Sequence, residues 1–195
     1  MEFSAGLPKQ GQTWYGTQLT EPTSPNTVPS GSSDQVTQLE GARATFRPIS
    51  KTITNGIRNV LPGGEQLAIL VRNSSGGALL PGQLVNWSSG YIGRRVGAKA
   101  TAAAASNAGI VDPYLPSAGV ADGDLFWLFR SGPVYVRMVA ATFAVSDIIV
   151  ASATAGSCNK KGSAYAFGDI GFCQEAVETA AGDLVLTILK LEAYS

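Results

Sequence analysis

The sequence LFWLFRSGPVYVRMV occupies residues 125–139, and its apolar character decides the expected fold. In an extended strand, successive side chains point to opposite faces of the sheet. Phe126 and Leu128 would therefore lie on one face, and Trp127 and Phe129 on the other. Both faces are apolar, which is typical of a strand buried in a core or at a subunit interface. We predict either two strands or one strand with a corner at the central Ser-Gly-Pro.

Other short apolar runs occur along the chain and are separated by Gly, Ser and Asn. Three of them begin directly after a Gly turn, which accepts a positive φ at little cost. The alanine-rich segment 97–108 is expected to form a loop or a short helix. Short strands at close spacing, without a long helical period, predict an all-β barrel or sandwich. The further strands are expected at residues 65–72, 83–87, 91–96, 147–151, 169–177 and 183–192.

Residues 1–60 differ from the rest of the chain, because they are rich in Gly, Pro, Ser, Thr and Gln. Their apolar residues are too sparse to build a core, so this segment cannot fold alone. We expect an extended N-terminal arm over residues 1–60 and a β-rich domain over residues 61–195. External contacts would have to offset the entropy lost on ordering the arm. Large aromatic side chains dominate interface energetics, and the candidate arm anchors are Phe3, Trp14, Tyr15 and Phe46.

The charge balance and the absence of histidine exclude several functions. The 14 basic and 14 acidic residues give a net charge of zero, so no overall field favours nucleic acid or a membrane. The chain has no histidine, the commonest general base and metal ligand. We therefore expect a protein that is not an enzyme and has no catalytic, cofactor-binding or metal-binding residues. An enzyme would have to rely on Asp112, Asp122, Asp124 or Asp147.

The local charge motifs favour structural roles. Asp122-Gly123-Asp124 lacks the distal glutamate of a calcium loop, and we interpret it as a turn. The basic pairs at 94–95 and 160–161 are isolated beside glycines, whereas nucleic-acid surfaces need clustered basic residues. We interpret both pairs as solvated loop charges.

The two cysteines, Cys158 and Cys173, are too few for a disulfide framework in a chain that can bury a core. We expect them to be free, buried and reduced. The first residues lack the basic and apolar pattern of a signal peptide, and no apolar run approaches the length of a membrane span. We therefore expect synthesis in the cytoplasm and no membrane partner.

The aromatic cluster allows two interpretations. Phe126, Trp127, Phe129 and Tyr135 could fill a core or a trimer interface, or the rings of Trp127, Phe129 and Tyr135 could line a carbohydrate or peptide groove. The apolar residues on both strand faces favour the core or interface.

Several motifs, in their order along residues 65–192, resemble small phage head decoration (cement) proteins. The resemblance rests on GIVDPYLPSAGV (109–120), GDLFWL (123–128), SGPV (131–134), IGF (170–172), Glu175-Ala176 and AGDLV (181–185).

The resemblance implies a compact β-barrel or β-tulip-like domain that is non-catalytic and forms homotrimers. It implies a place on the outer capsid surface of the virion, where the major capsid protein and neighbouring decoration subunits are the partners and the shell is stabilised. The long N-terminal zone departs from the shortest members of the family. Another virion component, such as a head fibre or tail protein, and a carbohydrate- or peptide-binding β module are the alternatives.

Overall fold

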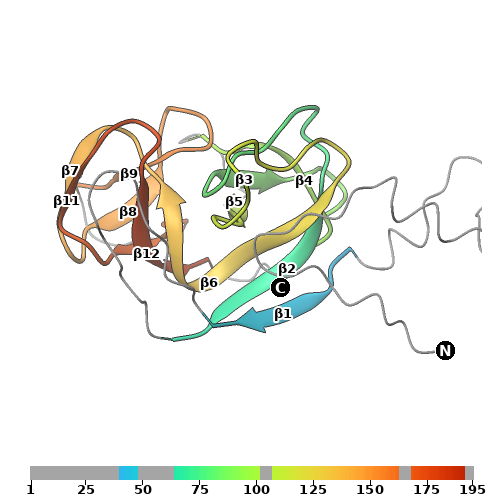
Figure 1. The fold of residues 1–195 in the computed structure, drawn as a ribbon, viewed down its shortest axis with the longest axis horizontal. Coiled ribbons are helices and arrows are strands. Elements are labelled where there is room, and N and C mark those ends of the chain that lie inside the picture. Colours follow the sequence, from blue (N-terminus) through green and yellow to red (C-terminus); the bar gives the residue numbers. More distant parts are fainter. Residues whose placement is uncertain (1–39, 48–63, 102–106, 163–167, 192–195) are drawn as a thin grey trace, which may run out of the picture.

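The longest strand, β6 (Leu125–Arg137), organises the fold. The computed structural model describes residues 40–47, 64–101, 107–162 and 168–191. The first half of β6 pairs antiparallel with β2 (Gln66–Asn73), and its second half pairs with β12 (Leu184–Lys190). The strand therefore runs through two neighbouring groups of strands, as Figure 1 shows.

The corner that the sequence predicted at Ser131-Gly132-Pro133 lies inside this single strand. Gly132 has a φ of +90°, a conformation that residues with a side chain rarely adopt. A Cβ atom there would also collide with the Glu65 carbonyl oxygen, just before β2 begins. Glycine thus lets β6 change partners from β2 to β12 without a break.

The described residues form twelve strands and no helix. The all-β prediction is therefore confirmed, and in this part of the chain no helix is available that could cross a membrane. The remaining strands are β1 (Arg43–Phe46), β3 (Leu84–Trp87), β4 (Arg95–Lys99), β5 (Asn107–Val111), β7 (Ala141–Phe143), β8 (Ile148–Ala151), β9 (Cys158–Lys160), β10 (Gly171–Cys173) and β11 (Val177–Thr179).

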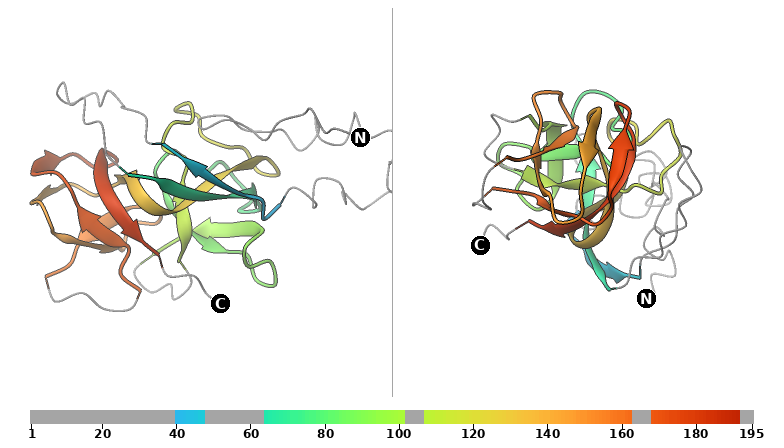
Figure 2. Two further views of the ribbon diagram at one scale, coloured as in Figure 1. Left: turned by 90° about the horizontal axis from the view of Figure 1, so that it is seen from below. Right: turned by 90° about the vertical axis from the view of Figure 1, so that its left-hand side faces the viewer.

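Ten of these strands make one sheet in the order β1-β2-β4-β3-β5-β6-β12-β10-β8-β9, and β7 pairs with β11. An additional pairing between β2 and β6 joins β2, β4, β3, β5 and β6 into a ring of hydrogen-bonded neighbours. The sheet as a whole does not close into one barrel, because β1 and β9 stand at its two ends. Figure 2 shows β1 lying beside β2 along the outside of the sheet.

Side chains of β6 alternate between two separate cores. The sequence predicted the alternation and the apolar character of both faces, but not that each face packs into a core of its own. Trp127 and Phe129 belong to one apolar cluster, which reaches under β12 and β8. Phe126 and Leu128 belong to the other, which fills the space among β2, β3, β4 and β5. The first half of β6 thus lies between the two cores and is buried on both faces.

Two local expectations differ from the structure. In the segment 97–108, residues 97–99 belong to β4 and residues 107–108 to β5, residues 100–101 lie outside any strand, and residues 102–106 lie outside the described residues. Both described ends are extended because β4 and β5 pair with β3. The strand expected at 91–96 begins only at Arg95, because Gly90 and Gly93 adopt positive φ and place the preceding residues in turns.

A third expectation, one strand over 169–177, was also wrong. The structure divides this stretch into β10 and β11, which belong to different sheets. Between them the buried Glu175 turns inward, and its Oε1 atom accepts a hydrogen bond from the Leu186 amide at 2.7 Å. A buried carboxylate that bonds a neighbouring strand interrupts the ladder at that point.

Replacing Trp127 with alanine tests how much the buried side chains of β6 contribute to stability. Because the indole is 1% exposed, the substitution should lower the free energy of unfolding by about 3 to 5 kcal/mol. Equilibrium urea denaturation measures the change. Val145→Ala is the matched control, since Val145 is 57% exposed and its loss should cost less than about 0.5 kcal/mol. A Trp127→Ala protein as stable as the control would contradict the core assignment.

Candidate functional site

The four aromatic residues singled out from the sequence all lie in the interior of the single chain. Phe126, Trp127, Phe129 and Tyr135 are each buried. The Tyr135 ring packs edge-on against Tyr114, with 6.3 Å between the centroids. Buried rings offer no face to a sugar or a peptide, so the groove interpretation loses the residues on which it depended.

The four aspartates that an enzyme would need hold turns or lie buried. Asp112 Oδ1 accepts a hydrogen bond from the Tyr114 amide, and Asp122 Oδ1 accepts one from the Gly76 amide, each at 2.9 Å. Asp147 Oδ2 accepts one from the Ala144 amide at 2.8 Å. Asp124 is buried directly before β6. Within the described ranges, no cluster of three potential metal ligands occurs.

Among the candidate arm anchors, Phe3, Trp14 and Tyr15 lie outside the described residues. Phe46 is the last residue of β1, and its ring packs edge-on against Trp127 with 5.1 Å between centroids. The same ring lies 5.9 Å from that of Phe129. Phe46 therefore contacts the β domain of its own chain, although it lies within the range 1–60 assigned to the arm.

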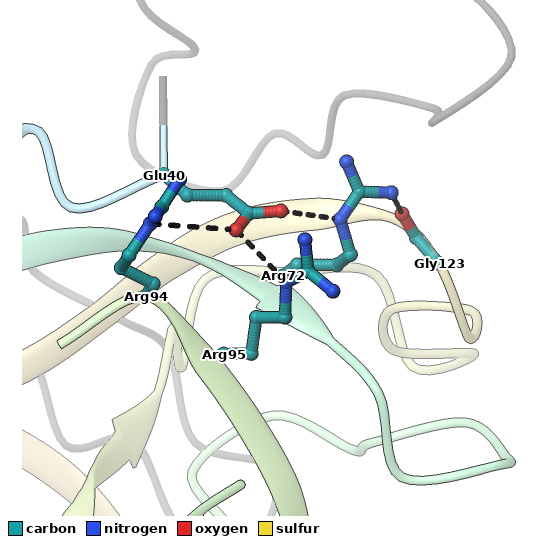
Figure 3. A network of polar contacts seen from close by, with 5 residues as sticks. All are labelled: Glu40, Arg72, Arg94, Arg95 and Gly123. Atoms are coloured by element: carbon teal, nitrogen blue, oxygen red, sulfur yellow. Dashed lines mark hydrogen bonds and ion pairs between the residues drawn. The ribbon is translucent and has the colours of Figure 1, made fainter. Parts of the chain in front are cut away.

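An ion-pair cluster around Glu40 is the most distinctive polar feature of the described chain (Figure 3). Arg72 Nε lies 2.5 Å from Glu40 Oε1, and Arg95 Nε lies 2.9 Å from Oε2. Arg94 Nε is more distant, at 3.8 Å from Oε2. The Glu40 side chain is 0% exposed, whereas those of Arg72 and Arg95 are 14% and 23% exposed. The carboxylate is thus fully removed from water and held from two sides. We call these four residues the Glu40 cluster.

The elements around the Glu40 cluster hold its members in place. Arg72 lies on β2, and its Nη1 atom also donates to the Gly123 carbonyl oxygen at 2.9 Å. The guanidinium of Arg95 lies 4.4 Å above the Tyr91 ring. Next to Glu40, the Gly41 amide donates to the Leu70 carbonyl at 2.7 Å. These contacts fix the guanidinium groups and the backbone that carries the carboxylate.

The cluster carries more positive than negative charge, since three arginines surround one carboxylate. Burying a carboxylate is costly unless it is paired and hydrogen-bonded, and here both oxygens have a guanidinium partner. Arg72 Nη2 is buried without a partner. The arrangement therefore holds the chain's own Glu40 carboxylate between two guanidinium groups.

No local sequence pattern predicts this cluster. The interpretation of Arg94-Arg95 as solvated loop charges does not hold for Arg95, which binds the buried Glu40, whereas the Arg94 side chain is 46% exposed. Glu40 lies 32 residues from Arg72 and 55 residues from Arg95 along the chain. At such separations no local pattern links a carboxylate to its partners.

The second basic pair also has partners. Lys161 Nζ binds the Asp169 carboxylate at 2.9 Å, and Lys160 Nζ donates to the Thr142 carbonyl at 2.7 Å. These contacts join β9 and the residue after it to neighbouring segments. The interpretation as solvated charges therefore does not hold for Lys161, which is paired and partly buried, whereas Lys160 is exposed.

Both cysteines are free and buried, which confirms the prediction that they are not linked. Cys158 belongs to the cluster beneath β12, and its burial raises the pKa of its thiol above the ordinary value. Cys173 Sγ contacts the Glu175 carbonyl oxygen at 3.1 Å. Burial keeps both thiols away from reagents, and the raised pKa of Cys158 keeps that thiol protonated and therefore a poor nucleophile.

Comparison with solved structures finds a likeness to the N base of the head fibre protein gp8.5 of bacteriophage phi29. The TM-score is 0.41 at 16% identity, and the match covers 64% of this chain and 94% of that chain. No family model and no curated protein sequence matches the chain. A likeness this distant identifies neither a family nor a function.

The thiols should be unreactive in the folded protein. Because burial raises the pKa of Cys158, that thiol stays protonated at pH 8 and hidden from reagent. Ellman's reagent should react slowly with the native protein and should titrate two thiols per chain in denaturant. A Cys158–Cys173 bridge found by mass spectrometry under non-reducing conditions would contradict this prediction.

Replacing Glu40 with alanine should destabilise the protein by about 1 to 3 kcal/mol, because partly buried guanidinium groups lose their carboxylate partner. Urea denaturation measures the total, and hydrogen exchange should show the largest loss of protection at the amides of Gly41 and Leu70. Glu65→Ala is the matched control, since Glu65 is exposed. Equal stability of the two variants would show that the Glu40 cluster does not hold the segment.

Proposed function

We propose that this chain is a non-catalytic structural protein of a tailed-phage virion that decorates the outer capsid surface and reinforces the shell. The ordered set of motifs between residues 65 and 192, which resembles phage head decoration proteins, supports this proposal. Its partners would be the major capsid protein and neighbouring copies of itself, and the resemblance favours a homotrimer.

The observation that carries the proposal is the anchoring of the chain at Glu40. A 39-residue segment rich in Gly, Pro, Ser and Thr precedes this residue, and such a composition cannot build a core. Glu40 is buried and ion-paired, and β1, three residues later, is paired along its length with β2. The segment therefore joins the β domain at a point fixed by charged contacts and by backbone pairing. If residues 1–39 bind the capsid, this fixed point would transmit their attachment directly to the β domain.

The rival functions have less support. A carbohydrate- or peptide-binding module would need exposed aromatic rings, but Trp127, Phe129 and Tyr135 are buried. An enzyme would have to work without histidine, and three of its candidate aspartates bind backbone amides in turns. A structural role requires none of these groups.

We expect the full chain to bind particles that lack it, and residues 1–39 to be necessary for this. A truncation that begins at Glu40 removes residues 1–39 but keeps the Glu40 cluster and β1. The full chain should co-sediment with particles made without it, whereas the truncated chain should stay in the supernatant. Circular dichroism and urea denaturation of the truncated chain serve as the control, because its domain should remain folded.

Three outcomes are informative. If the truncated chain binds as tightly as the full chain, the β domain itself carries the attachment. If the full chain does not co-sediment, the proposed function is wrong. Many copies per particle would support a decoration role, whereas a few copies would indicate a minor virion component.

A further inference from the structure

Residues 40–46, here called the docking segment, form a small unit with its own binding site. Glu40 enters the Glu40 cluster, and β1 pairs antiparallel with β2 from Arg43↔Ile69 to Phe46↔Gln66. At its end, the Phe46 ring covers the edge of Trp127. The docking segment thus makes three successive contacts: its carboxylate with the arginines of β2 and β4, its strand with the edge of β2, and its aromatic ring with Trp127 of β6.

The connection between the docking segment and β2 is much longer than the geometry requires. Phe46 and Gln66 stand directly opposite each other, so a hairpin of about two to five residues would join them. Residues 47–65 supply 19 residues instead. Fully extended, these could span up to about 60 to 70 Å. A domain of this size has a radius of gyration of about 15 Å and is roughly 40 Å across, so the connection can reach a neighbouring copy.

The binding site must be filled, whichever chain supplies the docking segment. Without it, the guanidinium groups of Arg72 and Arg95 would lose their carboxylate, and the β2 edge would lose its partner. The edge of Trp127 would also lose the ring that covers it. None of these contacts depends on the path of the connecting residues. A docking segment from a second copy would make the same contacts.

We propose that copies of this chain exchange their docking segments, so that Glu40 and β1 of one copy bind β2 and the arginines of the next. Exchange of an identical element adds an intermolecular link without requiring a new interface, because the contacts are those already present within the chain. A long connection adds little to the entropic cost of closing the loop within one chain, but it also permits the segment to reach a neighbour. The inference rests on the proposed self-association, which keeps neighbouring copies close.

Cysteine cross-linking between separately marked chains tests the exchange. Thr45 and Leu67 face each other across β1 and β2, and both are exposed. Residues that face each other in antiparallel strands have Cα atoms about 4.5 to 5.5 Å apart, within the range that a disulfide bridges. One full-length chain carries Thr45→Cys, and a second, differently tagged chain carries Leu67→Cys. The two are co-expressed and mildly oxidised, and the native cysteines do not compete because both are buried.

Exchange predicts a covalent heterodimer on a non-reducing gel. Thr45→Cys paired with Val145→Cys is the matched control, because Val145 is exposed but lies outside the docking site. The heterodimer should exceed this control several-fold, and adding Glu40→Ala to the Thr45→Cys chain should reduce it. A single chain that carries both Thr45→Cys and Leu67→Cys should form covalent oligomers.

The opposite result would overturn the exchange. If the double variant is bridged only within single chains, and the mixed chains give no more heterodimer than the control, then each docking segment binds its own chain. Sedimentation of the purified protein would show separately whether it self-associates, and co-sedimentation with particles would still test the proposed function. A failure of the exchange is therefore distinguishable from a failure of the function.

Discussion

The burial of β6 on both faces is the constraint on which the rest of the structure depends. Trp127 and Phe129 point to one face of β6, and Phe126 and Leu128 point to the other. Because all four side chains are apolar, neither face of this strand can be left in contact with water. Strands must cover it on both sides, and both of its edges need hydrogen-bonding partners. β2 and β5 meet this requirement along its first half, and β12 continues the pairing along its second half. The two cores and the ring of five strands follow from this requirement.

Much of this could be predicted from local sequence, because apolar runs between glycines indicate short strands wherever they occur. The runs that became β2, β6 and β12 are recognisable for that reason. The failures have separate local causes. Positive φ at Gly90 and Gly93 shortens the strand expected at 91–96, and the buried Glu175 interrupts the strand expected at 169–177. The β4 and β5 strands each carry a central glycine, and their pairing with β3 holds them extended. Such tertiary pairing is invisible in a window of ten residues.

The Glu40 cluster could not be predicted for a different reason. A carboxylate in a polar segment and two adjacent arginines beside a glycine each have the composition of a solvated loop. They become a buried site only when β1 is laid along β2 and the turn before β4 folds toward it. Residues 40–47 have the composition of the arm, yet their described contacts are with the β domain.

The position of the Glu40 cluster determines how a load on the N-terminal segment would reach the core. Residue 39 is followed at once by Glu40, so tension would act first on the ion pairs to Arg72 and Arg95. Arg72 lies near the end of β2, whose preceding residues are paired with β1 on one edge and with β6 on the other. Force would thus pass along β2 into a strand that both cores hold. The charged contacts would therefore bear the load first, and the apolar packing of β6 would resist it next.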